Sequence, residues 1–225
     1  MNTFRIGDIV LYKNNQLIAF NKPSGITSQT DGSADKSLDE LASIFCGHPV
    51  QVVHRLDRPA SGAILYAKNK TAVATMHEQF ADREVEKTYF AIVMKAPEIP
   101  AATLTHYLEF NLKVNKAFIT EDKEKGKEAI LSYETVGHSD RYTLLKVKLH
   151  TGRQHQIRVQ LAAIGSPIRG DVKYGFRRGN KDRSIQLHSF ELKFKHPVSG
   201  QLERIIAPVP DEPVWKAFEK FIPNE

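Results

Sequence analysis

A short polar turn between two apolar runs constrains the fold of this chain most strongly. Residues 52–53 and 63–67 are apolar, and between these runs Asp57 stands between Arg55 and Arg58. A proline and a glycine follow, so the pattern predicts a strand, a tight turn and a second strand. A carboxylate in such a turn is held by a rigid scaffold yet open to a ligand, and flanking cations suit an anionic substrate. On this stretch alone, a structural ion pair is the plainer interpretation.

The composition is that of an ordinary globular protein. The chain has 225 residues, of which 41% are hydrophobic and 26% charged, and this length fits one large or two small domains. The single cysteine, Cys46, excludes a disulfide framework and a cysteine zinc site, so we expect a reducing, cytoplasmic setting. No apolar run approaches the length of a membrane span, and the first residues lack the apolar core of a signal peptide.

Positive charge gathers in one part of the chain. The formal net charge is +6, and residues 141–200 hold 13 lysines and arginines against 3 acidic residues. A basic segment in an otherwise slightly acidic chain suggests a face that binds a polyanion. Lysines scattered over a solvated surface are the alternative, and composition alone does not separate the two.

Apolar runs separated by turn residues predict a series of strands. They are expected at 9–13, 16–21, 62–68, 85–95, 129–136, 141–149, 186–195 and 201–206. Segment 97–127 loses this periodicity and ends in a run of charges, so we expect an excursion from the core, with a hairpin as a candidate structure.

A capping box predicts the first helix. Ser37 is followed three residues later by Glu40, and Gly47 provides a stop signal. The buried face of this helix is expected to consist of Leu38, Leu41, Ile44 and Phe45.

Three later segments also carry helix signals. Residues 70–82 show a helical period, a second capping-box pattern at Thr151 predicts a helix to Ala163, and Pro213 opens a last amphipathic segment. The apolar positions of the last segment are Trp215, Phe218 and Phe221.

Five sequence blocks, taken in order, resemble those of the RluA-type pseudouridine synthases. They are Asn-Lys-Pro-Ser-Gly at 21–25, His-Arg-Leu-Asp at 54–57, Lys-Thr-Tyr at 87–89, Thr-Gly-Arg-Gln-His-Gln-Ile-Arg at 151–158 and Gly-Asp-Val-Lys-Tyr-Gly at 170–175. The second and fourth blocks are the specific ones, and the resemblance runs from about 21 to 208. It implies an α+β fold with a mixed, largely antiparallel sheet flanked by helices. We expect a single catalytic domain over 1–225, without a separate N-terminal RNA-binding module.

The resemblance also implies a reaction and three catalytic residues. Uridine in RNA is converted to pseudouridine, so the N1–C1′ bond breaks and C5 joins C1′. Nothing is oxidised or hydrolysed, and we expect no cofactor and no metal. By resemblance Asp57 is the catalytic carboxylate, acting at the base or at the sugar, and Arg158 pairs with it. Tyr89 stacks on the target base and is a candidate for handling the C5 proton.

The expected partner is structured RNA, rRNA or tRNA, and the expected oligomeric state is a monomer. The target base must leave its stack, and Arg55 is the candidate to fill the gap. Ile157 is a candidate apolar wall of the uracil pocket. Five further cations could hold the RNA backbone, although each alone is an ordinary surface cation. They are Lys22, Arg153, Lys173, Arg177 and Arg178.

Two histidines in these blocks are not expected to bind metal. No third ligand follows His54 or His155 at a recognisable spacing, and histidines at such positions are typically hydrogen-bond donors. The chain departs from the common family pattern at 58–60 and at Gln160, which bears on the identity of the substrate.

Two other functions stay open at this stage. A non-catalytic RNA-binding or folding factor could use the same scaffold, but binding alone does not require Asp57, Tyr89 and Arg158 together. An acid-dependent hydrolase or metal nuclease would call for clustered carboxylates, whereas the core motifs contain Asp57 alone.

Overall fold

The computed structural model describes residues 4–32 and 35–223, which fall into two compact units. The first unit comprises Met1–Lys87 and His188–Val209, and the second comprises Thr88–Leu187 and Pro210–Glu225. The expected single catalytic domain over 1–225 stays a prediction.

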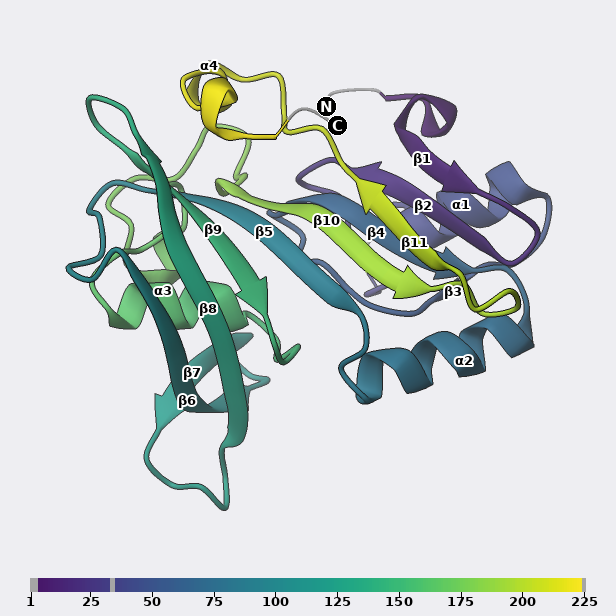
Figure 1. Ribbon diagram of the computed structural model, residues 1–225, viewed down its shortest axis with the longest axis horizontal. Helices are drawn as coiled ribbons and strands as arrows, with labels where there is room; N and C mark the ends of the chain where they lie inside the picture. Colours follow the sequence, from purple (N-terminus) through teal and green to yellow (C-terminus); the bar gives the residue numbers. More distant parts are fainter. Residues whose placement is uncertain (1–3, 33–34, 224–225) are drawn as a thin grey trace. The chain divides into compact units, whose positions relative to one another are not determined.

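The strands of the first unit follow the order β1-β2-β4-β10-β11, and β3 also pairs with β4. All of these pairings are antiparallel except β4 with β10, which is parallel (Figure 1). Every residue of β4 is buried, as its continuous apolar sequence predicts. The strands span Val10–Lys13 (β1), Leu17–Lys22 (β2), Gln51–Val52 (β3), Ser61–Ala67 (β4), Leu187–Lys195 (β10) and Leu202–Ile206 (β11).

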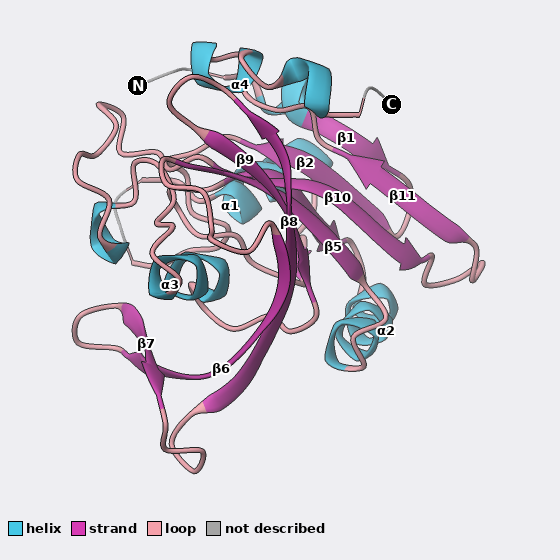
Figure 2. Cartoon of the chain, turned by 60° about the vertical axis from the view of Figure 1, so that its left-hand side comes forward, coloured by secondary structure: helices cyan, strands magenta, loops and turns pink. Residues whose placement is uncertain are grey.

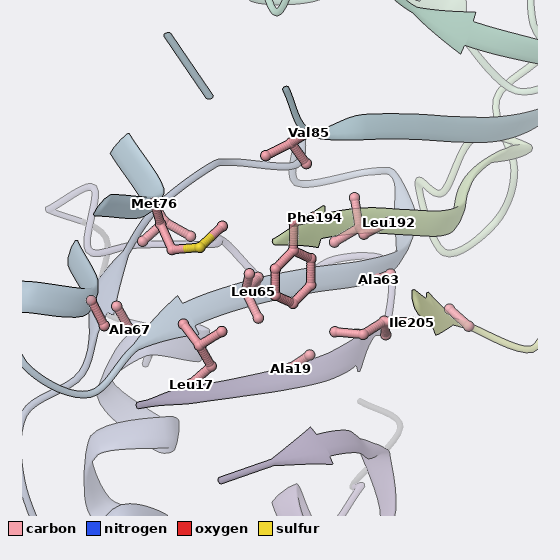
Figure 3. Packing of buried hydrophobic residues seen from close by; sticks show 13 residues of the cluster. Leu17, Ala19, Ala63, Leu65, Ala67, Met76, Val85, Leu192, Phe194 and Ile205 are labelled. Carbon is pink, nitrogen blue, oxygen red and sulfur yellow. The ribbon is translucent and has the colours of Figure 1, made fainter. Parts of the chain in front are cut away.

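A cluster of hydrophobic side chains forms the core of this unit (Figure 3). Leu17 and Leu65 come from neighbouring strands, Phe194 comes from β10, and Met76 comes from helix α2, Lys70–Ala81. Asn69 caps this helix by accepting a hydrogen bond from the backbone N–H of Ala72 at 2.9 Å. The helix expected at 70–82 is thereby confirmed.

Helix α1, Leu38–Cys46, has the predicted capping box between Ser37 and Glu40 and ends at Gly47 in the left-handed conformation. Its expected buried face is only half right, because Leu38 is buried but Ile44 and Phe45 are exposed. Phe45 instead lies under the ammonium of Lys13, 4.8 Å from the ring centre. A short 3-10 helix, η1, precedes β1 at Ile6–Ile9.

The strands of the second unit follow the order β5-β9-β8-β6-β7, with every pairing antiparallel (Figure 2). Segment 97–127 does form a hairpin, but its first strand is not an excursion, because it pairs with β8 along most of its length. The strands span Glu86–Val93 (β5), Ala101–Asn111 (β6), Lys116–Thr120 (β7), Lys127–His138 (β8) and Thr143–Leu149 (β9). The helical elements are α3 (Gln156–Ala163), η2 (Val172–Tyr174), α4 (Pro213–Lys216) and η3 (Glu219–Phe221).

Two helix predictions in this unit are wrong in detail. The last amphipathic segment breaks into α4 and η3 instead of forming one helix. The capping box at Thr151 does not form, and α3 begins at Gln156, because His155 has a left-handed backbone with φ of 57°. The hydroxyl of Thr151 instead donates to the side-chain oxygen of Gln156 at 2.8 Å. In this bond Thr151 is the donor, whereas in a capping box its oxygen would accept from the helix backbone. Among the described residues, no helix is long and apolar enough to cross a membrane.

The parallel contact of β4 with β10 generates a stability prediction. Gly62 has φ of +111°, and a methyl group there would overlap the backbone of Ser189. Gly200, in the turn between β10 and β11, has φ of +70° with open space around it. We expect Gly62→Ala to lower the free energy of unfolding by about 3 kcal/mol, from strain and overlap together. Gly200→Ala, with strain alone, should lower it by about 1 kcal/mol.

Urea unfolding followed by circular dichroism measures both variants. Equal losses would show that the backbone of Ser189 does not approach Gly62 as closely as the structure has it.

Candidate active site

Asp57 lies in the loop between β3 and β4, and apolar neighbours anchor this loop. Leu56 and Ala60 are buried, whereas Asp57 is half-buried and both Arg55 and Arg58 are exposed. The N–H of Ala60 donates to the carbonyl of Asp57 at 3.0 Å, which closes the predicted turn. The loop therefore holds its apolar residues inward and presents one carboxylate between two cations.

A second loop, over 23–28, is bonded to the Asp57 loop. The N–H of Gly25 donates to the carbonyl of Arg58 at 2.8 Å, and Arg58 Nε returns a bond to the carbonyl of Gly25 at 2.7 Å. Ser28 Oγ donates to the carbonyl of Leu56 and accepts from its N–H, at 2.8 and 3.0 Å. Arg58 also pairs with exposed Asp35 at 2.8 Å. The guanidinium of Arg58 thus serves the scaffold.

Lys22 contradicts the expectation of a surface cation that grips RNA. It ends β2, its side chain is fully buried, and Nζ donates to the carbonyls of Pro23, Ile26 and Arg58 at 3.1, 3.0 and 3.3 Å. Burial lowers the pKa of Lys22 to about 7, while the charge of Asp57 acts to raise it. The reason for the correction is that these carbonyls, brought in by two loops, form an internal site for the ammonium.

His54 accepts a hydrogen bond at one of its two ring nitrogens, and the expectation that it donates stays a prediction for the other, Nδ1. Its Nε2 accepts from the N–H of Leu65 at 3.0 Å, and its ring stacks on Phe80 with 4.9 Å between centres. Burial, together with the charge of Lys87, lowers the pKa of His54 to about 3. A neutral imidazole that accepts from the next strand fixes the start of the Asp57 loop. Within residues 4–32 and 35–223, no group of three potential metal ligands is found.

Ser61 and His188 fix the other end of this loop, and no sequence signal pointed to them. His188 Nε2 lies 3.0 Å from the carbonyl of Ala207, which can only accept, so this nitrogen carries the proton. Nδ1 then accepts from the hydroxyl of Ser61 at 2.8 Å. Burial lowers the pKa of His188 to about 4, so the ring is neutral at physiological pH. The pair is enclosed and holds the first residue of β4.

Tyr89 lies on β5 in the second unit, opposite Val147 of β9, and is almost fully buried. This burial is compatible with a core aromatic and with a wall of a base pocket, so its role in stacking stays a prediction. On the same strand, Lys87 in the first unit places Nζ over the ring of Phe80 at 5.7 Å, and burial lowers its pKa.

Arg158 lies on α3 and is buried, so it is not an exposed helix residue. Its Nε and Nη2 donate to the two carboxylate oxygens of Asp171 at 2.7 and 2.8 Å, and its guanidinium lies over Tyr174 at 5.0 Å. Asp171 is itself buried. A two-pronged bond of this kind fixes the plane of the guanidinium. The pairing of Arg158 with Asp57, which belongs to the other unit, stays a prediction.

Asp171 and Tyr174 come from the last of the five sequence blocks, but sequence reasoning gave them no role. The N–H of Ala117 donates to the hydroxyl of Tyr174 at 2.8 Å, and the same hydroxyl is hydrogen-bonded to His155 Nδ1 at 2.9 Å. The expectation that His155 donates a hydrogen bond stays a prediction. These bonds tie the β6–β7 hairpin to α3. Ile157, beside Arg158, is buried.

The predicted RNA-contacting cations divide into two kinds. Arg153 Nε donates to the carbonyl of Glu128 at 2.9 Å, and Lys173 Nζ donates to the carbonyl of Asn115 at 2.8 Å. Arg153 therefore holds the start of β8, and Lys173 holds the turn between β6 and β7. Arg55, Arg177 and Arg178 are exposed, as a phosphate or base contact requires.

A polar network orders the loop that carries Arg177 and Arg178. Arg169 Nη1 donates to Asn180 Oδ1 at 3.0 Å and to Gln186 Oε1 at 2.7 Å. Asn180 Nδ2 in turn donates to Gln186 Oε1 and to the carbonyl of Ser184. The loop is thus fixed by amide groups, which leaves its two arginines on the outside.

The buried pair generates the second prediction. Asp171→Asn leaves the Arg158 guanidinium buried with a neutral partner, so we expect the free energy of unfolding to fall by about 3 kcal/mol or more. Asp35→Asn, at the exposed pair with Arg58, should change it by less than about 1 kcal/mol. Guanidinium chloride unfolding measures both. Similar small losses would show that the Arg158–Asp171 bond does not hold the second unit together.

Comparison with known proteins places these residues in a family context. A family model described as RNA pseudouridylate synthase matches residues 16–163. "Ribosomal large subunit pseudouridine synthase C" of Salmonella typhimurium is 31% identical, over 91% of this chain and 67% of that protein. The Escherichia coli K12 protein of the same name is 30% identical, over 96% and 70%.

Two solved structures share the fold. Human RNA Pseudouridylate Synthase Domain Containing 4 has a TM-score of 0.78 at 22% identity, over 97% of this chain and 96% of that one. Human RNA Pseudouridylate Synthase Domain Containing 1 has a TM-score of 0.78 at 25% identity, over 95% and 89%. The expected α+β fold with a mixed, largely antiparallel sheet is therefore confirmed.

Proposed function

This chain belongs to the RNA pseudouridylate synthase family, as a member of its RluA type, and we propose that it isomerises specific uridines of ribosomal RNA with Asp57 as the catalytic carboxylate. Large-subunit rRNA is the favoured substrate because the curated relatives carry that substrate in their names. The observation that supports Asp57 most directly is its setting. It is a half-buried carboxylate on a loop fixed by His54, by Ser61 and by the 23–28 loop.

The reaction needs a carboxylate, a held base and an acceptor for one proton. The N1–C1′ bond of uridine breaks, the base turns, C5 bonds to C1′, C5 then loses its proton, and N1, now free of the sugar, gains one. While the base and the sugar are separated, Asp57 can add to either of them. The bond to Asp57 is broken again before the product is released, so either route regenerates the carboxylate. Tyr89 is proposed to stack on the base, and its oxygen is the candidate to receive the C5 proton. Arg158 is proposed to pair with Asp57 and keep it ionised.

The exposed cations have roles in holding RNA. A base within a stem must be extruded before reaction, and Arg55, two residues from Asp57, is proposed to stack in the gap. Arg177 and Arg178 are proposed to contact phosphates, while Ile157 is proposed to line the uracil pocket. We also propose that the protein is cytoplasmic and acts as a monomer. The alternative substrate is tRNA.

The third prediction tests the carboxylate. Asp57→Asn keeps the shape of the side chain but removes its capacity to act as a base or nucleophile. We expect isomerisation to fall at least about a thousandfold, with the fold retained and the RNA affinity almost unchanged. Asp82→Asn, an exposed acid at the end of α2, is the matched control and should keep wild-type activity.

Release of tritium from C5-labelled uridine measures the reaction, on transcripts of large-subunit rRNA, small-subunit rRNA and tRNA. Release from large-subunit rRNA alone supports the proposed substrate, and release from tRNA alone would replace it. An Asp57→Asn protein within about tenfold of wild type would remove Asp57 from catalysis. Binding of RNA without any release by the wild type would favour the non-catalytic factor.

The fourth prediction concerns the RNA-binding face. Phosphate contacts release counterions, so affinity should fall as salt rises. Charge reversal to Glu at Arg177 and Arg178 should flatten this dependence, whereas reversal at Lys13 and Lys220 should not. Filter binding of a large-subunit rRNA fragment at several KCl concentrations measures the slopes. Equal changes at all four positions would show that the loop over 176–186 is not an RNA-binding face.

A further inference from the structure

The ammonium of Lys22 has an internal site that the reaction scheme does not use. Nζ is fully buried and faces three backbone carbonyls at 3.0 to 3.3 Å, those of Pro23, Ile26 and Arg58. An ammonium has three N–H groups and matches three acceptors, whereas a neutral amine has only two. The geometry therefore fits the charged form.

The three carbonyls come from the two loops of the site. Pro23 and Ile26 lie in the 23–28 loop, and Arg58 directly follows Asp57 in the chain. The backbone bond from Gly25 to Arg58 joins the same two loops. Lys22 thus holds the peptide between Arg58 and Pro59, one residue beyond Asp57, and so restrains the loop that carries the Asp57 side chain.

Charge also links Lys22 to Asp57. Burial lowers the pKa of Lys22 to about 7, the negative charge of Asp57 acts to raise it, and the positive charge of Arg58 acts to lower it. A buried cation is costly unless an opposite charge or several dipoles compensate. The three carbonyls and Asp57 together supply that compensation.

We infer that Lys22 is a positioning residue of the active site, which orients Asp57 by clamping the carbonyls around it and attracting its carboxylate. This inference rests on the proposed catalytic role of Asp57. In this role Lys22 makes no contact with RNA, unlike the roles proposed for the exposed Arg55, Arg177 and Arg178.

The fifth prediction separates positioning from RNA binding. Lys22→Met keeps an unbranched side chain but removes the charge and the three N–H groups. At saturating RNA, we expect the single-turnover rate to fall about a hundredfold, while the Kd for RNA stays within about threefold. Lys68→Met is the matched control. Lys68 also donates to a backbone carbonyl, that of Asn14 at 2.7 Å, and its variant should keep the wild-type rate.

Direct titration of Lys22 in folded protein covers the case in which Lys22→Met does not fold. The side-chain carbon and nitrogen resonances of Lys22 are followed by NMR against pH in wild type, Asp57→Asn and Arg58→Met. Removing Asp57 should lower the pKa of Lys22, whereas removing the Arg58 charge should raise it. A lysine on which these two charges do not act would respond to neither change.

The outcomes distinguish this inference from the proposed function. A wild type that releases no tritium overturns the catalytic assignment, whatever Lys22 does. With an active wild type, a Lys22→Met rate within about threefold of normal, or a loss confined to Kd, overturns positioning. A Lys22 pKa that does not shift in Asp57→Asn overturns the electrostatic link in either case.

Discussion

The antiparallel pairing of β2 with β4 is the contact on which the first part of the site depends. It runs from Leu17 opposite Ala67 to Lys22 opposite Gly62, with nearly every position buried. Continuous burial fixes the register, because a slip by one residue would reverse the facing of every side chain. The register brings the end of β2 to the start of β4, so that Lys22 lies under the loop that carries Asp57.

The second unit achieves the same rigidity by polar means. Arg158 is held by both oxygens of Asp171, and the ring of Tyr174 covers its guanidinium. The hydroxyl of Tyr174 then connects β7 to His155, the residue before α3. In each unit a residue with a proposed role in the reaction is thus held by groups that do not take part in that reaction, as preorganised sites require.

Much of this organisation was predictable from the sequence, since burial and turn signals decide most of the strands. The strand, turn and strand around Asp57 follow from apolar runs with a polar turn between them. What failed depends on tertiary contacts. Lys22 looked like a surface cation because the carbonyls that enclose it come from residues as distant as Arg58. Ile44 is exposed although the helical period placed it inside.

The capping box at Thr151 failed for a related reason. The side chain of Gln156 accepts from the hydroxyl of Thr151 and from the N–H of Arg153 at 2.8 and 3.0 Å, and α3 then starts after the left-handed residue His155. The four-residue capping-box pattern does not include Gln156, the residue that binds Thr151 and Arg153 instead. The proposed pairing of Asp57 with Arg158 rests on motif resemblance, because the two residues belong to different units.

The central claim is that the chain rearranges a glycosidic bond without hydrolysing it. Reaction of large-subunit rRNA in water enriched in oxygen-18, followed by digestion and mass spectrometry of the nucleosides, tests this claim directly. An isomerase produces pseudouridine with the mass of uridine, without oxygen-18 and without free uracil. Free uracil together with an oxygen-18 label on the sugar left in the RNA would show hydrolysis instead, and would contradict the account.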